Sequence, residues 1–575
     1  MTGGTEMRIP WISVLAIAAA SLPAVYAQTN DVVMSAMRDE MARSMKQLTV
    51  ENLEKPYFIS YRVVDSDTVS VGAEFGALTR DVASRGRRLT VEVRVGDYKL
   101  DNSHLFSFDV DMGTRLRIFN GTTELPLEDD YKELRRQLWL ATDATYKKAV
   151  ADLSKKRGLL QAQSREDESD DFSKEDPAVT SYDLPAVKVS AADWEKEARS
   201  LSALFREMPA IYTSSVLMNC FNTYTRYLTS EGTSYTRREP SLTFTGNAAT
   251  QAADGMPLEQ MTWAQGRSLA ELPSEDELAA RLKAIGRDLT ELRDANTLAN
   301  YSGPVLVEGD AAAQLVHRVL LFSLTATKRT VSGMPGGQPN PNQGDNPFLD
   351  KIGARVLPEF LSLSDNPTIP VYQGRRLGGF SKMDEDGVPS REVQLVENGI
   401  LKTLLASRDP VRGVSRSTGS RHVGQAAPSN VIMTVSNGLS GDQLHAKFMD
   451  LVKQQNRPFG IVVRWLRNGN NAGLNALLAY KVFPDGHEEL IRGMQFFGLN
   501  AVSFKDIAAA SRDLNFLTVR YEPPRGQFPM TNEGEEIFTP VSLLVPSLLF
   551  EDATLRKVRI AAPNPPVSGH PFFSK

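Results

Sequence analysis

Two hairpin patterns in the second half of the chain limit most strongly what it can fold into. Strand-like runs turn on Asn398-Gly399 and, later, on Asp485-Gly486. These dipeptides favour the two-residue turns that join neighbouring antiparallel strands. Further strand-like runs are residues 430–435 and 459–465. The second half therefore predicts a mainly antiparallel sheet.

A strand, a turn and a helix precede these hairpins. Residues 304–308 are apolar and strand-like, Gly309 offers a turn, and Asp310 suits the N-cap of a helix that we expect over 311–324. One face of this helix holds Leu315, Val319 and Phe322 at helical spacing, so we expect these side chains to pack as core. The stretch 332–347 is rich in Pro, Gly and Asn and predicts a long loop.

The first half combines strands with long helices. Residues 57–69 and 89–95 alternate as strands do, so we expect the first domain to open in antiparallel β-structure. Helical spacing follows over 127–161 and over 274–294, where Ser274 begins an acidic first turn. We predict an α+β protein of two domains, residues 28–299 and residues 300–575.

Length and charge bound the class of protein. A chain of 575 residues exceeds a single hydrophobic core, which agrees with two domains. The net charge of −5 argues against nucleic acid as a partner, because nucleic-acid binding needs a strongly basic surface. Residues 165–177 are mostly acidic, and we interpret them as a solvated surface loop; a carboxylate metal site is the alternative.

The first 27 residues have the pattern of a secretory signal peptide. Arg8 precedes an apolar run that ends in small residues at Ala27, where we expect cleavage. The run is shorter than the roughly 20 apolar residues that span a bilayer, so no stable membrane insertion is expected. We predict export to the periplasm or the medium. The single cysteine, Cys220, forms no intramolecular disulfide and no Cys-pair metal site.

One cationic segment is a candidate for substrate binding. Arg416, Arg421 and His422 lie among Gly and Ser residues in a chain that is otherwise acidic. A flexible segment of this kind suits the carboxylate or backbone of an extended peptide. The alternative is a solvated loop whose arginines pair with nearby acids.

Several stretches, in this order, resemble the C-terminal domain of the TldD/PmbA family. They are YSGPVLVEGDAAAQLVH, LGGFSKMDEDGVPSREVQLVENGILKTLLASRD, SRSTGSRHVG and AYKVFPDGHEELIRGMQFFGLNAVSFKDI. The resemblance covers roughly residues 300–560. The resemblance rests on the order of several elements, each of which is weak alone.

The resemblance implies a metal site that this chain has lost. In the TldD branch a helix with the pattern His-Glu-x-x-x-His supplies two metal ligands and a general base, and a later cysteine completes the site. On this sequence the three positions hold His317, Arg318 and Phe322, and residues 516–538 contain no cysteine. Residues five apart on a regular helix point about 140° from each other. The family relieves this with a Gly where this chain has Leu321.

Two functional classes follow from the resemblance. The first is a noncatalytic subunit, like the PmbA branch, that pairs with a TldD-like paralogue or with itself and helps to bind peptide substrates. No cofactor is expected in that case, because catalytic zinc usually takes three protein ligands and the motif here supplies only His317. The alternative is an active zinc peptidase with an unconventional metal site.

Overall fold

The computed structural model places most of the chain. It describes residues 31–49, 53–106, 122–162, 167–333, 346–467, 473–521, 539–558, 564–566 and 568–573. The expected signal peptide, residues 1–27, lies outside the described residues, and so does most of the expected loop at 332–347.

Seven strands of the first half form one long sheet in the order β4-β2-β1-β6-β7-β5, with β8 paired to β7. Their bounds are β1 Pro56–Glu74, β2 Ala77–Val95, β4 Thr122–Glu124, β5 Val179–Asp183, β6 Thr213–Thr229, β7 Ser234–Gln251 and β8 Pro257–Gly266. All the pairs are antiparallel except that of β5 with β7. The prediction of antiparallel β-structure in this half is confirmed.

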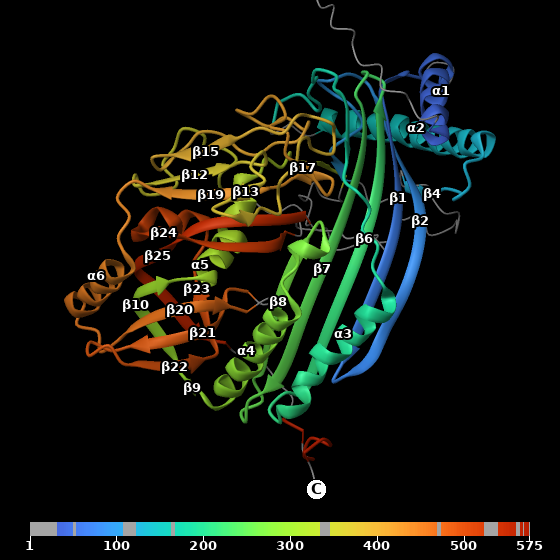
Figure 1. The fold of residues 1–575 in the computed structure, drawn as a ribbon. Helices are drawn as coiled ribbons and strands as arrows, with labels where there is room; N and C mark the ends of the chain where they lie inside the picture. Colours follow the sequence, from blue (N-terminus) through green and yellow to red (C-terminus); the bar gives the residue numbers. More distant parts are fainter. Residues whose placement is uncertain are drawn as a thin grey trace, which may run out of the picture.

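Helices cover one face of this sheet in two pairs. Ile59, Tyr61, Val63 and Val71 occupy alternate positions of β1 and are buried, so they lie on the same face. The first three pack with α1 (Val32–Gln47) and α2 (Tyr131–Ala162). Val71 packs with α3 (Ala191–Ala203) and α4 (Glu275–Asp294). Figure 1 shows the two helix pairs near opposite ends of the long strands.

The first helix was missed by the sequence analysis, which expected this domain to open in strands. Asp31 caps α1, because its side chain accepts a hydrogen bond from the backbone N–H of Met34 at 2.9 Å. Met34, Met37 and Met41 are buried along one side of the helix. The capping residue and this apolar stripe were both present in the sequence.

Two other helices agree with their prediction. α2 runs without a break through Thr142 and Thr145, whose hydroxyls donate to carbonyl oxygens four residues earlier. α4 begins with a complete capping box, in which Ser274 and Glu277 bond each other's backbone N–H.

Twelve strands of the second half form a second sheet, with the main order β16-β15-β12-β19-β25-β10-β20-β21-β22-β9 and with β23 and β24 also paired to β25. The bounds are β9 Asn296–Thr297, β10 Asn300–Val307, β12 Leu361–Asp365, β15 Val393–Glu397, β16 Ile400–Leu401, β19 Asn430–Val435, β20 Gly460–Leu466, β21 Asn475–Val482, β22 Glu488–Arg492, β23 Met494–Phe497, β24 Ile507–Tyr521 and β25 Thr539–Lys557. Three two-stranded sheets add β3 Leu105–Phe106 with β11 Val331–Ser332, β13 Val371–Tyr372 with β14 Arg375–Arg376, and β17 Arg421–His422 with β18 Gln425–Ala426.

The second sheet is covered on both faces. Val305 and Val307 of β10 pack with α5 (Asp310–Leu315) in the largest hydrophobic cluster. Leu306, which points the other way, packs with Phe448 of α6 (Gly441–Gln454). The fold is α+β, as predicted, and each half of the chain has its own sheet and helices.

The hairpin turns also agree with their prediction. Asn398 and Gly399 both have positive φ, at 47° and 79°, and join β15 to β16. Gly486, with φ of 89°, lies in the turn between β21 and β22. The sheet is mainly antiparallel, although β10 pairs with β20, β19 with β25 and β22 with β9 in parallel.

The acidic segment at 165–177, which the structure describes from Asp167 on, is a loop as predicted, but only part of it is solvated. Asp171 is buried and forms an ion pair of 2.6 Å with buried Lys156. Phe172 lies under two guanidinium groups, those of Arg94 and Arg408. The centre of the segment therefore joins the first domain to the second, whereas other acids of the segment, such as Asp176, are exposed.

No helix in the part of the chain that the structure describes is long and apolar enough to cross a membrane.

Candidate functional site

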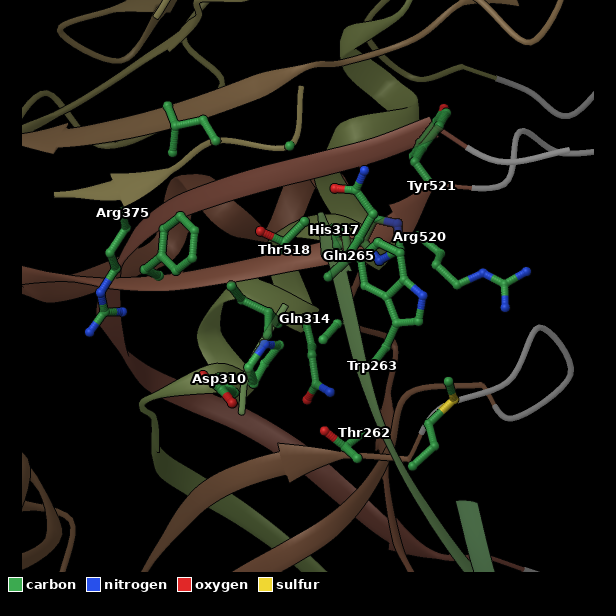
Figure 2. A pocket seen from close by; sticks show the side chains of 18 of the residues that line it. Thr262, Trp263, Gln265, Asp310, Gln314, His317, Arg375, Thr518, Arg520 and Tyr521 are labelled. Carbon is green, nitrogen blue, oxygen red and sulfur yellow. The ribbon is translucent and has the colours of Figure 1, made fainter. Parts of the chain in front are cut away.

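A cavity of about 1930 Å³ lies between the two domains. One side is formed by β8 and α4 of the first domain, through residues such as Trp263 and Arg281. The other side is formed by α5 and by the end of β24, through residues such as Asp310 and Tyr521 (Figure 2). Pockets for small molecules measure roughly 300–1,000 Å³, so this one is large enough for a segment of extended peptide.

The helix below the cavity is not the regular helix that we predicted. α5 ends at Leu315 and continues as a π-helical turn, Val316–Leu320, in which Leu321 N–H donates to the carbonyl of Val316. A short 3₁₀ turn, Leu321–Leu324, then ends it. A π-turn adds one residue to the i→i+4 spacing, so it brings positions five apart towards the same side. His317, Arg318 and Phe322 accordingly all line the cavity.

Two details of the expected helix change with this geometry. Asp310 is its first residue and Gly309, at φ of 60°, occupies the N-cap, so the prediction of Asp310 as N-cap is wrong. Leu315 is buried as predicted and Val319 packs partly against the core, but Phe322 faces the cavity. The π-turn rotates the apolar face, because the extra residue shifts every later side chain by about one position.

His317 points towards the centre of the cavity (Figure 2). Its ring lies 5.9 Å from the ring of Tyr521, edge to face. Burial, and to a lesser extent the charge of Arg318, lowers the pKa of His317 to about 4. The imidazole is therefore neutral at neutral pH.

Arg318 occupies the position at which the resemblance described above implies a general base. Its Nη1 donates to the carbonyl of Gly473 at 3.0 Å. Burial lowers the pKa of this guanidinium, and among the described residues no carboxylate lies within ion-pair distance to offset that cost. A fixed cation cannot accept the proton of an attacking water, and it repels a divalent metal.

The residues present do not fit a zinc ion. A catalytic zinc site usually takes three protein ligands, and of the three motif positions only His317 has a ligating side chain. Within the described ranges, no group of three His, Cys, Asp or Glu side chains is placed to hold a metal. Cys220 lies buried in β6 of the other domain, and burial raises the pKa of its thiol to about 11.

The cationic segment that we predicted to bind substrate lies elsewhere. Arg416 is 58% exposed and pairs with Glu175 at 2.9 Å. Arg421 pairs with Asp386 at 3.4 Å, and His422 Nε2 lies 3.1 Å from Ser429 Oγ. None of the three predicted residues is among those that line the cavity. Their nearest partners are acids and a serine of the chain itself.

The sequence analysis missed most of the cavity wall. Trp263 and Gln265 come from β8, and Thr518 and Tyr521 come from β24, some 250 residues later (Figure 2). The alternation in 514–521 was a strand signal, but that stretch was used only to search for a cysteine. No local pattern reveals that two distant strands enclose one space.

Comparisons with known proteins agree with this architecture. Residues 300–557 match the family model described as the PmbA/TldA metallopeptidase C-terminal domain. A metalloprotease of Methanocaldococcus jannaschii is 30% identical over 205 residues, which are 33% of this chain and 42% of that protein. The chain thus covers less than half the length of this curated relative.

Two solved structures share the fold over nearly the whole chain. TldE from Thermococcus kodakarensis has a TM-score of 0.54 and 14% identity, covering 90% of this chain and 99% of that one. A Thermotoga maritima protein solved as a candidate modulator of a DNA gyrase has a TM-score of 0.55 and 14% identity, covering 91% and 99%. At such low identity the likeness concerns the fold alone.

Proposed function

The chain belongs to the TldD/PmbA family, and from that premise we propose that it is a noncatalytic subunit that binds peptides. One observation carries the proposal: the cavity and its π-helical turn are present, but the positions of the family's base and second ligand hold Arg318 and Phe322. Loss of the ligands without loss of the cavity removes hydrolysis and leaves binding.

The cavity suits a peptide in size and in lining. Its wall combines aromatic side chains, such as Trp263 and Phe516, with amide and hydroxyl groups, such as Gln265 and Thr518. Apolar surface with a few polar groups is the usual composition of a binding cavity.

We also propose that the chain works in an assembly with a TldD-like paralogue, or with itself, and that it acts after export. The fold shared with TldE supports a subunit role, since a chain without its own metal ligands needs a partner for hydrolysis. Export rests on residues 1–27. Sequencing of the mature N-terminus should read from Gln28; a chain that retains Met1 would contradict export.

Hydrolysis assays test the noncatalytic role. The purified chain, with and without added zinc, should leave unstructured peptides intact, while fluorescence anisotropy should detect their binding. A chain isolated with a tag from its own host should bring down a relative that keeps His-Glu-x-x-x-His, or behave as a dimer in light scattering. Peptide cleavage by the isolated chain, lost to chelator and restored by zinc, would support the alternative of an active zinc peptidase.

A further inference from the structure

The cations that line the cavity differ in how they are neutralised. Arg376 pairs with Glu271 at 3.2 Å. Arg267 lies 3.9 Å from Glu239 and also donates to the carbonyl of Phe380 at 2.6 Å. Arg318 has only the neutral carbonyl of Gly473. Unlike Arg376 and Arg267, the guanidinium at the eroded metal motif therefore lacks a carboxylate partner within the described residues.

Nearby carboxylates do not supply that charge. Asp310 lies eight residues earlier on the same helical segment, roughly 12 Å along the axis. The cations that act on Asp310 are Arg281 and Arg375, and its own pKa is raised by burial. The cost of burying Arg318 is therefore not balanced within the described residues.

Besides Arg318, the cavity wall holds two buried donors that have no partner within the described residues. Tyr521 is 4% exposed, and its hydroxyl has no partner in the described structure. The indole N–H of Trp465, another lining residue, is likewise buried without a partner there. His317, whose ring lies 5.9 Å from that of Tyr521, is neutral and makes no hydrogen bond within the described ranges. Donors in excess over acceptors favour a ligand that accepts.

We propose that this end of the cavity, at Arg318, His317 and Tyr521, binds a carboxylate of the peptide. A guanidinium binds a carboxylate through charge-assisted hydrogen bonds, which are stronger than those to a neutral carbonyl. The substitution that removed the general base of a metal hydrolase would thus have created an anion site. This inference rests on the proposed peptide binding and specifies which group of the peptide is recognised.

Two sources of the carboxylate exist, the C-terminus of a peptide and an acidic side chain. Three probes separate them: pentaalanine with a free C-terminus, its C-terminal amide, and an amidated pentapeptide with a central glutamate. We expect the full-length protein to bind at least one of the two carboxylate peptides about tenfold more tightly than the plain amide. Isothermal titration calorimetry measures all three affinities.

Variants assign the preference to Arg318. R318Q should reduce the preference to about onefold, while R318K, which keeps the charge, should retain part of it. R376Q is the matched control, because Arg376 lines the same cavity but is paired and 64% exposed; it should keep the preference. A preference that survives R318Q would overturn the assignment.

The wild-type comparison decides the inference even if a variant does not fold. Equal affinity for all three probes contradicts carboxylate recognition and leaves peptide binding intact. Binding of none of them contradicts both the inference and the proposed function.

Discussion

Two arginines, Arg408 buried between the domains and Arg318 in the wall of the cavity, have opposite surroundings. Arg408 is 1% exposed, pairs with Glu231 at 2.7 Å, donates to the carbonyl of Ser173 at 3.0 Å and lies 3.9 Å from the ring centre of Phe172. Arg318 has one bond to a carbonyl and no carboxylate within the described residues. The charge of Arg408 is therefore balanced within the chain, whereas Arg318 still has N–H donors for a ligand.

The difference distinguishes a structural cation from a binding one. The pKa of Arg408 is raised, because Glu231 and other acids outweigh the effect of burial. The pKa of Arg318 is lowered, because only burial acts on it. The composition of the sequence did not reveal this difference. It pointed to the segment that includes Arg416 and Arg421 as the candidate for substrate binding.

The largest expected effect is on Arg408. R408M should lower the free energy of unfolding by about 3–5 kcal/mol, because Glu231, whose side chain is only 11% exposed, loses its cationic partner. Urea denaturation followed by circular dichroism measures it. The matched control is R318M, which should change the free energy by less than about 1 kcal/mol, because no buried acid loses a partner. Equal losses in the two variants would break the comparison.

A second effect concerns Asp365, a fully buried carboxylate that lies outside the cavity. Its Oδ1 accepts from Ser429 N–H at 2.9 Å, and its Oδ2 has no partner in the described structure. Burial raises its pKa from 3.8 to about 7. Below this pKa the Asp365 carboxyl is protonated and neutral, whereas the guanidinium of Arg318 remains charged.

The pH dependence follows from that shift. The folded state holds the proton more tightly than the unfolded state, so the stabilisation is complete below about pH 4 and is lost as pH rises through 7. In the wild-type protein this loss amounts to at most roughly 4 kcal/mol between low and high pH. D365N keeps the acceptor for Ser429 N–H and does not titrate, so it should show no such loss. Thermal unfolding of both proteins from pH 4 to pH 8 measures the difference, which should grow in favour of D365N as pH rises.

Local features of the fold and the three motif positions His317, Arg318 and Phe322 were predictable from the sequence, but the cavity around them was not. The hairpin at Asn398-Gly399 and the capping box of α4 depend on residues a few positions apart, so the pattern alone predicts them. The π-turn at Val316–Leu320 was not predictable from apolar spacing, because that spacing assumes a regular helix. The cavity depends on β8 and β24 meeting across the domains.

A smaller effect is expected at His317. H317A should lower the free energy of unfolding by about 1 kcal/mol, through lost contact with Tyr521, and should leave peptide binding detectable. Chemical denaturation and anisotropy measure the two quantities. If the protein has a zinc-dependent activity and H317A abolishes it, His317 is a zinc ligand and this prediction is wrong.

The smallest effect is expected at Arg416. We predict that R416Q changes the free energy of unfolding by less than about 0.5 kcal/mol, since Arg416 is 58% exposed and Glu175 keeps its hydrogen bonds from Ser173 and Ser417. If the segment contacts peptide, as the sequence predicted, R416Q should weaken peptide affinity by about threefold. Titration of R416Q beside the exposed control R412Q measures this; equal affinities would remove Arg416 from the substrate contacts.

In the proposed noncatalytic role, the position of the family's metal site serves as a binding site without metal. Elemental analysis of the purified protein, after incubation with zinc and removal of the excess, tests it most directly. The account predicts zinc far below one ion per chain, because His317 stands beside Arg318 and Phe322 instead of further ligands. One zinc ion per chain, lost in H317A, would contradict it.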